Sequence, residues 1–340
     1  MHYFADYGIF LAKFLTVAFI IVVTLAAILM LLTKVKEQQG AMRLKIKKLN
    51  AHYDEVKEMI QSAVLNKHQL KKAHKNDKKR HKAEEKAEDH KANLFVINFE
   101  GDIRASAVQS MSELITAILL TAQPDDEVLL RLESGGGLVN AYGLASSQLQ
   151  RLRDAKIKLT IAIDKMAASG GYMMACVADK IIAAPFAIIG SIGVIAQLPN
   201  FHRFLEKHHI DFEQVTAGEY KRTLTLFGEN TRKARQKLQE EIDDTQGLFK
   251  AFIGTHRPQV DLDKVATGEH WFAKQALELA LVDELKTSDD YLLMSKDHKA
   301  IYELHYVVKK PWVKRLGLAA ESLISKCLSG KWQQAGKDYL

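Results

Sequence analysis

A serine set among small residues is the first candidate for chemistry in this chain. Ser169 lies in the run Ala-Ala-Ser-Gly-Gly-Tyr, between an apolar segment typical of a β-strand at 158–164 and one typical of a helix at 172–178. At a helix N-terminus, unpaired backbone N–H groups and the positive end of the helix dipole stabilise a developing oxyanion. Ser169 is therefore a candidate nucleophile, and a helix N-cap among closely packed small residues is the alternative interpretation.

A nucleophilic serine needs a base, and the candidate is Lys221. It ends the run Thr-Ala-Gly-Glu-Tyr-Lys, which follows a strand-like segment at 212–216. An ammonium group has no lone pair, so a lysine can accept the serine proton only if burial or a nearby cation lowers its pKa from about 10.4 to about 7–8. A solvated turn lysine beside Arg222 is the alternative. Because Ser-Lys dyads are a known variant of the catalytic triad, no catalytic histidine is required.

Three consecutive glycines, Gly135 to Gly137, follow the strand-like segment 127–132. Without side chains, their backbone can approach a substrate carbonyl closely. Acyl transfer needs a nucleophile, a proton acceptor and two hydrogen-bond donors around the tetrahedral oxygen. The glycine run can supply such donors, and an ordinary strand-to-helix turn is the alternative interpretation.

Taken in order, several motifs resemble those of the signal peptide peptidase A (protease IV) family of membrane-bound serine peptidases. A set of motifs in a fixed order is far more specific than any one of them. The motifs are Glu133-Ser-Gly-Gly-Gly137, Ala167-Ala-Ser-Gly-Gly-Tyr172, Gly190-Ser-Ile-Gly-Val194, Ala217-Gly-Glu-Tyr-Lys221 and the closing segment Ala276-Leu-Glu-Leu-Ala-Leu-Val-Asp283.

The resemblance implies a role for each matching residue. Ser169 corresponds to the nucleophile, Lys221 to the general base, and Ser191 to a hydroxyl that holds and orients the lysine amine. The backbone N–H groups of Gly136 and Gly170 correspond to the oxyanion hole.

The chain departs from the family pattern in three places. Glu133 and Gly135 stand where the family usually has asparagine and proline, and Ala280 stands where glycine is common. Glycine in place of proline widens the range of backbone conformations open to the loop. We therefore retain Gly136 as an oxyanion donor and expect a less rigid loop around it.

From Leu94 onward, strand-like and helical segments alternate. This alternation predicts an α/β domain with right-handed crossovers, and the resemblance implies a ClpP/crotonase-like β-α superhelix. Strands are expected at 95–99, 127–132, 158–163 and 188–196, and helices at 106–121, 139–155, 172–179 and 231–256.

An apolar run near the N-terminus predicts a transmembrane anchor. Phe14 to Leu32 contains only two polar side chains, Thr16 and Thr24, and is about long enough to cross the hydrocarbon core of a bilayer as a helix. The sequence that follows, 31–36, lacks the small-residue cleavage site of a signal peptide, so we expect the helix to be retained.

The basic character of the chain comes from one segment. Residues 41–91 hold 15 Lys and Arg against 8 Asp and Glu, a net charge of +7 that equals the +7 of the whole chain. Such a segment favours contact with anionic lipid headgroups or a solvated helical stalk, and argues against a nucleic-acid-binding domain. Its first half is spaced as an amphipathic helix, and its second half, 71–91, is expected to be a mobile linker.

Neither the thirteen histidines nor the two cysteines indicate a metal site or a cofactor. Five of the histidines (His52, His68, His74, His81 and His90) lie in a charged segment, and neither they nor the pair His208-His209 have convincing metal-ligand spacing. Cys176 lies in an apolar helical segment far from Cys327, so the two are no disulfide framework. We expect no metal and no cofactor.

The sequence thus suggests four regions: an anchor at 1–36, a basic juxtamembrane segment at 37–91, a peptidase domain at 92–296 and an unassigned C-terminal extension at 297–340. The resemblance implies single-pass insertion in a bacterial inner (plasma) membrane. Six Lys and Arg at 34–48 against Lys13 before the helix place the peptidase domain in the cytoplasm by the positive-inside rule. The family works on the periplasmic side, so the orientation is left open.

These observations predict a membrane-anchored serine endopeptidase with a Ser-Lys dyad. The resemblance implies remnant signal peptides or membrane-protein fragments as substrates and a homo-oligomer as the assembled state. The expected partners are therefore peptide or protein substrates, the lipid bilayer and further copies of the chain, with no nucleic acid. A crotonase-like acyl-transfer enzyme and a catalytically silent membrane scaffold are the alternatives.

Overall fold

The computed structural model describes residues 13–22, 24, 26, 43–87 and 91–307. The chain divides into two compact units, and Lys45–His305 form the one that contains every predicted site residue. In the other unit, 13–22, 24 and 26 are helical. No helix within the described ranges is long and apolar enough to span a bilayer. Much of the predicted anchor Phe14–Leu32 lies outside the described residues.

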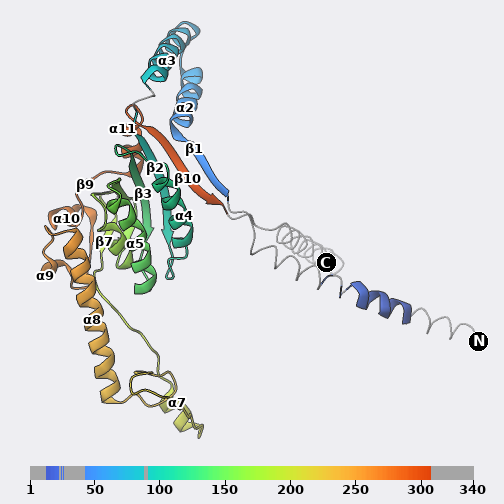
Figure 1. Ribbon diagram of the computed structural model, residues 1–340, viewed down its shortest axis with the longest axis vertical. Helices are drawn as coiled ribbons and strands as arrows, with labels where there is room; N and C mark the ends of the chain where they lie inside the picture. The colour runs from blue at the N-terminus through green and yellow to red at the C-terminus, as the bar shows by residue number, and fades with distance from the viewer. Residues whose placement is uncertain (1–12, 23, 25, 27–42, 88–90, 308–340) are drawn as a thin grey trace, which may run out of the picture. The chain divides into compact units, whose positions relative to one another are not determined.

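A predominantly parallel sheet is the centre of the Lys45–His305 unit (Figure 1). From β10 through β2, β3, β4 and β6 to β9, every neighbouring pair is parallel. β3 and β4 are buried along almost their whole length, as expected for apolar strands covered by helices on both faces. The order across the sheet is β1 (Arg43–Lys48), β10 (Ala300–Val307), β2 (Asn93–Gly101), β3 (Glu127–Ser134), β4 (Lys158–Ile163), β6 (Lys180–Ala183) and β9 (Glu284–Leu285).

Three short strands branch from the end of β3 and carry the candidate site. β5 (Met166–Ala168) pairs with β3 through Ala167 and Ser134, and with β7 (Ile188–Gly190) along its length. β7 pairs antiparallel with β8 (His270–Phe272). The last residues of β3, β5 and β7 therefore lie side by side.

Helices pack on the sheet and continue its apolar core. Leu49 of α2 and Leu292 of α11 are buried in a cluster with Leu94, Val96 and Ile301 of the strands, while α5 packs between α4 and α6. The helices are α2 (Leu49–Val64), α3 (Lys67–Ala87), α4 (Val108–Leu119), α5 (Val139–Asp154), α6 (Gly170–Ala175), α7 (His202–Lys207), α8 (Arg232–His256), α9 (Leu262–Val265), α10 (Ala273–Glu278) and α11 (Ser288–Ser295).

Three local predictions are wrong. The segment 212–216 has no strand structure and is exposed, because an isolated extended run without a neighbouring strand has nothing to pair with. Residues 43–48 form strand β1 instead of the start of an amphipathic helix. The strand expected at 188–196 ends at Gly190, because Ser191 has a φ of 51° and turns the chain.

The predicted linker 71–91 is also wrong in its described part, which is helical to Ala87. A reciprocal cap begins α3, in which the Asn66 side chain accepts from the Gln69 amide at 2.9 Å and the Gln69 side chain accepts from the Asn66 amide at 3.2 Å. Caps of this kind satisfy N–H groups that a helix start leaves unpaired. Lys57 of α2 pairs with Asp77 of α3 at 2.7 Å, so the second helix also has a packing partner.

Candidate active site

Ser169 ends β5 and begins α6. It is the N-cap of that helix, with φ 52° and ψ −118°, a backbone conformation that is unfavourable for a residue with a Cβ atom. Its amide donates to the Gly190 carbonyl oxygen at 2.8 Å and its carbonyl oxygen accepts from Met173 at 3.0 Å, so the strained turn is held at both ends. The side chain makes no capping hydrogen bond, which disfavours a purely structural N-cap.

A pocket of about 650 Å³ opens beside Ser169. Its lining includes Ser191 and the glycine loop, Gly135 to Gly137, and α8 forms a wall through side chains that include Gln239 and Gln246. The volume lies in the range of ordinary ligand pockets. The structure therefore brings Ser169, Ser191 and Gly136 to one cavity.

The two predicted oxyanion residues lie against each other. Gly136 has a φ of +86°, and a Cβ atom there would approach the Gly170 nitrogen to 2.7 Å and the Ser169 Cβ to 2.8 Å. Only glycine fits this position, because it tolerates both the positive φ and the close backbone. The Gly136 N–H donates to Ser134 Oγ at 3.0 Å, so in this conformation the loop is fixed by a neighbouring hydroxyl.

Ser191 enters the pocket from the turn that ends β7. Its φ is 51°, and its amide donates to the Glu269 carbonyl oxygen at 2.6 Å. The preceding Gly190 has a φ of +104° and lies against the Trp271 ring, which a Cβ atom would approach to 2.8 Å. The position of Ser191 is therefore fixed by backbone bonds to the segment before β8.

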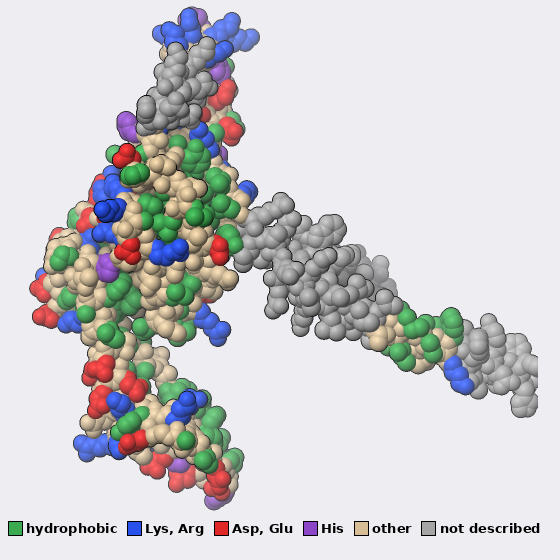
Figure 2. All heavy atoms as spheres, in the orientation of Figure 1, with side chains coloured by type: hydrophobic (Ala, Val, Ile, Leu, Met, Phe, Trp, Pro, Cys, Tyr) green, Lys and Arg blue, Asp and Glu red, His purple; other side chains and the backbone are tan. Residues whose placement is uncertain are grey.

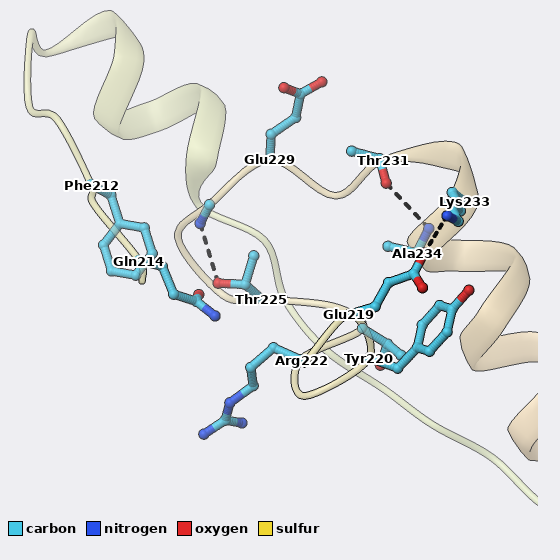
Figure 3. Close-up of a pocket in the computed structure, with 12 residues that line it drawn as sticks. Phe212, Gln214, Glu219, Tyr220, Arg222, Thr225, Glu229, Thr231, Lys233 and Ala234 are labelled. Atoms are coloured by element: carbon cyan, nitrogen blue, oxygen red, sulfur yellow. Dashed lines mark hydrogen bonds and ion pairs between the residues drawn. The ribbon is translucent and has the colours of Figure 1, made fainter. Parts of the chain in front are cut away.

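Lys221 lies elsewhere in the same unit. It is exposed and is not among the residues that line the pocket beside Ser169. The residues before it are attached to the beginning of α8, where Glu219 pairs with Lys233 (Figure 3). The Lys237 amine lies 5.4 Å from the centre of the Tyr220 ring. Along α8, the pocket-lining residues Gln239 and Gln246 lie about 9 and 20 Å beyond Lys233.

The segment that carries Lys221, residues 195–231, includes α7 and lies apart from the sheet (Figure 1). Many of its apolar side chains are exposed, and hydrophobic atoms mark this part of the surface in Figure 2. Val215, the extreme case, is 97% exposed. The apolar exposed residues are Ile195, Leu198, Phe201, Phe204, Ile210, Phe212, Val215, Tyr220, Leu226 and Phe227.

Gln246 was not singled out by the sequence analysis. Its Nε2 donates to the carbonyl oxygens of Ile192 at 3.3 Å and Ala266 at 3.1 Å, which joins α8 to the loop after Ser191. In the sequence, Gln246 is a polar residue at helical spacing within the apolar stripe of α8, between the inward-facing Ile242 and Phe249. A polar side chain within such a stripe must find partners when it is buried.

The closing motif is structural. Asp283 forms a bidentate ion pair with Arg257, with distances of 2.7 and 2.9 Å, and Arg257 is 3% exposed. The Tyr172 hydroxyl, three residues after Ser169, donates to the Leu281 carbonyl oxygen at 3.0 Å. These bonds attach α6 and the end of α8 to the segment before β9.

Cys176 is not a candidate nucleophile. It is fully buried in the turn after α6, and burial raises the pKa of its thiol to about 12. A thiol with that pKa is protonated at neutral pH and is a poor nucleophile.

On this α/β fold, Ser169 has a strained backbone at the start of a helix, and the backbones of Gly136 and Gly170 lie close beside it. Hydrolases that pass through an acyl intermediate use sites of this kind. Residues 2–149 match the N-terminal model of peptidase family S49, and residues 151–301 match the model of peptidase family S49 itself. The chain belongs to peptidase family S49 and is a protease of that family.

Close relatives support this assignment along most of the chain. The "Probable protease SohB" of Haemophilus influenzae is 47% identical over 327 residues, which cover 93% of this chain and 92% of that protein. The protein of the same name from Buchnera aphidicola subsp. Schizaphis graminum is 48% identical over 316 residues, with coverage of 91% and 92%. The resemblance to this family, and within it to SohB-type proteases, is confirmed.

Among solved structures, a mutant of the 1510-N membrane-bound stomatin-specific protease in complex with a substrate peptide aligns with a TM-score of 0.42 at 15% identity. The alignment covers 68% of this chain and 99% of that one.

Proposed function

We propose that the chain is a serine endopeptidase with Ser169 as nucleophile and Lys221 as general base. In this mechanism Ser169 Oγ attacks the scissile carbonyl carbon, and its proton passes to the neutral Lys221 amine. The lysine then gives the proton to the leaving amine, and water releases the acyl group by the reverse route. The observation that carries the proposal is the strained Ser169 turn, which faces a pocket shared with Ser191 and Gly136.

The remaining groups have supporting roles in the proposal. Backbone N–H groups of Gly136 and Gly170 stabilise the tetrahedral oxygen, and Ser191 orients the lysine amine. Charge that develops on the substrate oxygen is best stabilised by donors already in place. The close approach of the Gly136 and Gly170 backbones, where a Cβ atom on Gly136 would lie 2.7 Å from the Gly170 nitrogen, supports this assignment.

For the dyad to form, the 195–231 segment must pack differently from its position in a single copy. Its exposed apolar side chains, with Val215 97% exposed, are costly in water and are typical of an interaction surface. We propose that further copies of the chain cover this surface in a homo-oligomer. The assembled state then delivers Lys221 to a Ser169 pocket, either its own or that of a neighbour.

The cellular setting belongs to the same proposal. The apolar run Phe14–Leu32 anchors the chain in a bacterial inner membrane, and the peptidase domain has a ClpP/crotonase-like superhelix. The substrates are remnant signal peptides or membrane-protein fragments. An anchor raises the effective concentration of substrates that partition into the same bilayer. Proteoliposomes that contain the full chain should therefore cleave a lipid-inserted peptide faster than a soluble peptide with the same cleavage site.

Mixing two inactive variants tests the dyad and the assembly together. Ser169→Ala and Lys221→Ala should each be inactive alone. If neighbouring copies share a site, a mixture that is dissociated and reassembled should regain activity, because some pockets then combine an intact serine with an intact lysine. Inactivity of the mixture would show that both residues come from one copy. Substantial activity of either variant alone would exclude the dyad.

The separation of Lys221 from Ser169 in one copy is also what a silent scaffold would show. A hydroxyl-reactive phosphonate probe separates the two functions, since it labels only an activated serine. Labelling at Ser169 in the solubilised full chain supports the protease. Labelling that is absent, while a control serine peptidase in the same detergent reacts, supports the scaffold.

A further inference from the structure

Three hydrogen bonds connect the glycine loop to helix α5. The Gly136 N–H donates to Ser134 Oγ at 3.0 Å, Ser134 Oγ lies 2.5 Å from the Tyr142 hydroxyl, and that hydroxyl donates to the Asp102 carbonyl oxygen at 2.8 Å. Each hydroxyl has one proton. Because Tyr142 gives its proton to Asp102, Ser134 must give its own to Tyr142 and accept from Gly136. The donor and the acceptor of each of these three hydrogen bonds are thereby fixed.

Both hydroxyls are shielded from water. Tyr142 is fully buried and Ser134 is 2% exposed. Burial raises the pKa of the Tyr142 phenol, although the hydrogen bond with Ser134 opposes that shift. The phenol therefore stays protonated at neutral pH and remains a donor. Hydrogen bonds in such a dry environment hold their geometry because no water competes for the partners.

The last acceptor in this series of hydrogen bonds, the Asp102 carbonyl oxygen, lies in a rigid turn. The Asp102 carboxylate accepts from the Ser106 amide at 2.8 Å, from the Ser106 hydroxyl at 2.6 Å and from the Arg104 amide at 3.1 Å. This closes a tight turn after β2, and the Asp102 carbonyl oxygen is fixed with it. The hydrogen-bonded chain thus runs from a rigid turn to the glycine loop.

Tyr142 also touches the second oxyanion residue. A Cβ atom on Gly170 would lie 2.4 Å from Tyr142 Cγ and 2.8 Å from its Cβ and Cδ2, so the Gly170 backbone lies directly on the side chain. One tyrosine therefore contacts Gly170 with its ring and reaches Gly136 through Ser134.

We propose that Tyr142 is a positioning residue for the oxyanion hole, acting on Gly136 through Ser134 and on Gly170 by direct packing. This inference rests on the proposed function, in which these two glycines supply the oxyanion donors. The bond to Ser134 keeps the Gly135–Gly136 peptide from rotating away before substrate binds. A tetrahedral oxyanion carries a full charge and is a stronger acceptor than a hydroxyl, so it takes the Gly136 N–H from Ser134 as it forms.

The position of the glycine run makes such a brace necessary. Gly136 is preceded by another glycine, Gly135. Glycine leaves the peptide free to adopt several conformations, and an added hydrogen bond restores the restriction. The buried Ser134–Tyr142 pair supplies that bond.

Tyr142→Phe tests the proposal, because it retains the ring on Gly170 and removes only the hydroxyl. We expect kcat to fall roughly ten- to hundredfold with KM within about twofold of the parent, since loss of one oxyanion donor costs about 10² to 10³ in kcat and a misplaced donor costs less. Ser134→Ala should show the same split. The double variant should be no worse than the more affected single one, because both act through the same hydrogen-bonded chain.

Ser146→Ala is the matched control. Ser146 lies one turn further along α5, is fully buried, and its hydroxyl has no hydrogen-bond partner within the described part of the chain. The control should retain parental kcat. If Tyr142→Phe loses kcat only in proportion to lost folded protein, as judged by thermal unfolding and active-site titration, or matches Ser146→Ala, the inference is overturned.

Phosphonate labelling gives a second readout, because the probe's P=O oxygen occupies the oxyanion position. The labelling rate of Ser169 should fall in Tyr142→Phe and Ser134→Ala, and stay parental in Ser146→Ala. An unchanged rate in both variants would overturn the inference. Ser169→Ala distinguishes failure of the proposed function from failure of this inference. If Ser169→Ala still hydrolyses peptide, the proposed function is refuted. If Ser169→Ala is inactive and Tyr142→Phe is fully active, only the role of Tyr142 is refuted.

Discussion

The amide of Ser169 donates to the carbonyl oxygen of Gly190 at 2.8 Å, directly before Ser191. The bond extends the pairing of β5 with β7, in which Ala168 lies opposite Gly190. Two serines that are 22 residues apart in sequence thus enter one pocket from adjacent strand ends. Movement of one strand end must move the other, so Ser169 and Ser191 are coupled through the backbone.

The proposed dyad predicts a characteristic set of rate losses. Ser169→Ala and Lys221→Ala should each lower kcat by roughly 10³-fold or more, and the double variant should lose no more, since the pair acts as a unit. Ser191→Ala should lower kcat by a smaller factor, because in the proposed mechanism Ser191 orients the lysine amine and forms no bond to substrate. Steady-state hydrolysis of a peptide by the purified full chain measures all four. Additive losses in the double variant would contradict the dyad.

Gly136→Ala should abolish hydrolysis. Its new Cβ atom would meet the Gly170 nitrogen at 2.7 Å, and the φ of +86° is strained for alanine, so the two proposed oxyanion donors must separate. Gly143→Ala is the control, because it lies in α5 and an added Cβ meets nothing within 4 Å. That change should leave kcat unaltered and add up to about 1 kcal/mol of stability. A Gly136→Ala variant with parental kcat would rule out Gly136 as a donor.

Asp283→Ala should be strongly destabilising. It leaves the buried Arg257 guanidinium without its bidentate partner, and breaking a buried pair on one side costs about 3–5 kcal/mol. Asp263→Ala is the surface counterpart, since Asp263 is almost fully exposed in its pair with Lys250, and its loss should cost under about 1 kcal/mol. Chemical denaturation of both variants at neutral pH measures the difference, and equal costs would contradict the structural role of the closing motif.

Glu127 should make stability depend on pH. Burial of its carboxyl favours the neutral form, but hydrogen bonds from Lys299, Thr160 and Tyr291 outweigh burial and hold its pKa below the usual value. A group with a lowered folded pKa stabilises the fold above its unfolded pKa, about 4.3, and loses that contribution as pH falls through the folded value.

Glu127→Gln should therefore lower the free energy of unfolding by about 1–3 kcal/mol at pH 7. The gap between parent and variant should narrow as pH falls below about 4.3. Denaturant titrations from pH 3 to pH 8 follow the gap, with Glu100→Gln, at an exposed position of β2, as a control that changes little. A gap that widens toward low pH would contradict the assignment.

The sequence predicted best those strands and helices that a pattern of neighbouring residues records. Apolar runs gave β4 at its observed bounds and β2 and β3 within two residues at each end, and helical spacing gave α5 and α8 within a residue. Ser169 at a strand-to-helix junction was also correct. These features depend on residues that are neighbours along the chain, and a periodic pattern records them directly.

The predictions that failed concern segments whose structure depends on partners far away in the sequence. The run 212–216 has β-forming residues but no strand beside it, and Lys71 to Ala87 has a linker's composition but a capped start and a partner helix. Residues 300–304 pair with β2, beyond the boundary at 296 that composition suggested. No local pattern showed that the segment with Lys221 would be attached to the beginning of α8.

The attachment of Glu219 to Lys233 has a consequence for control of the enzyme. In the proposed mechanism a newly made chain has Lys221 outside the lining of the Ser169 pocket, so it is latent in the manner of a zymogen. Encounter with other copies becomes the activating event. Proteolysis then begins only where copies of the chain are concentrated, and an isolated copy spares the proteins around it.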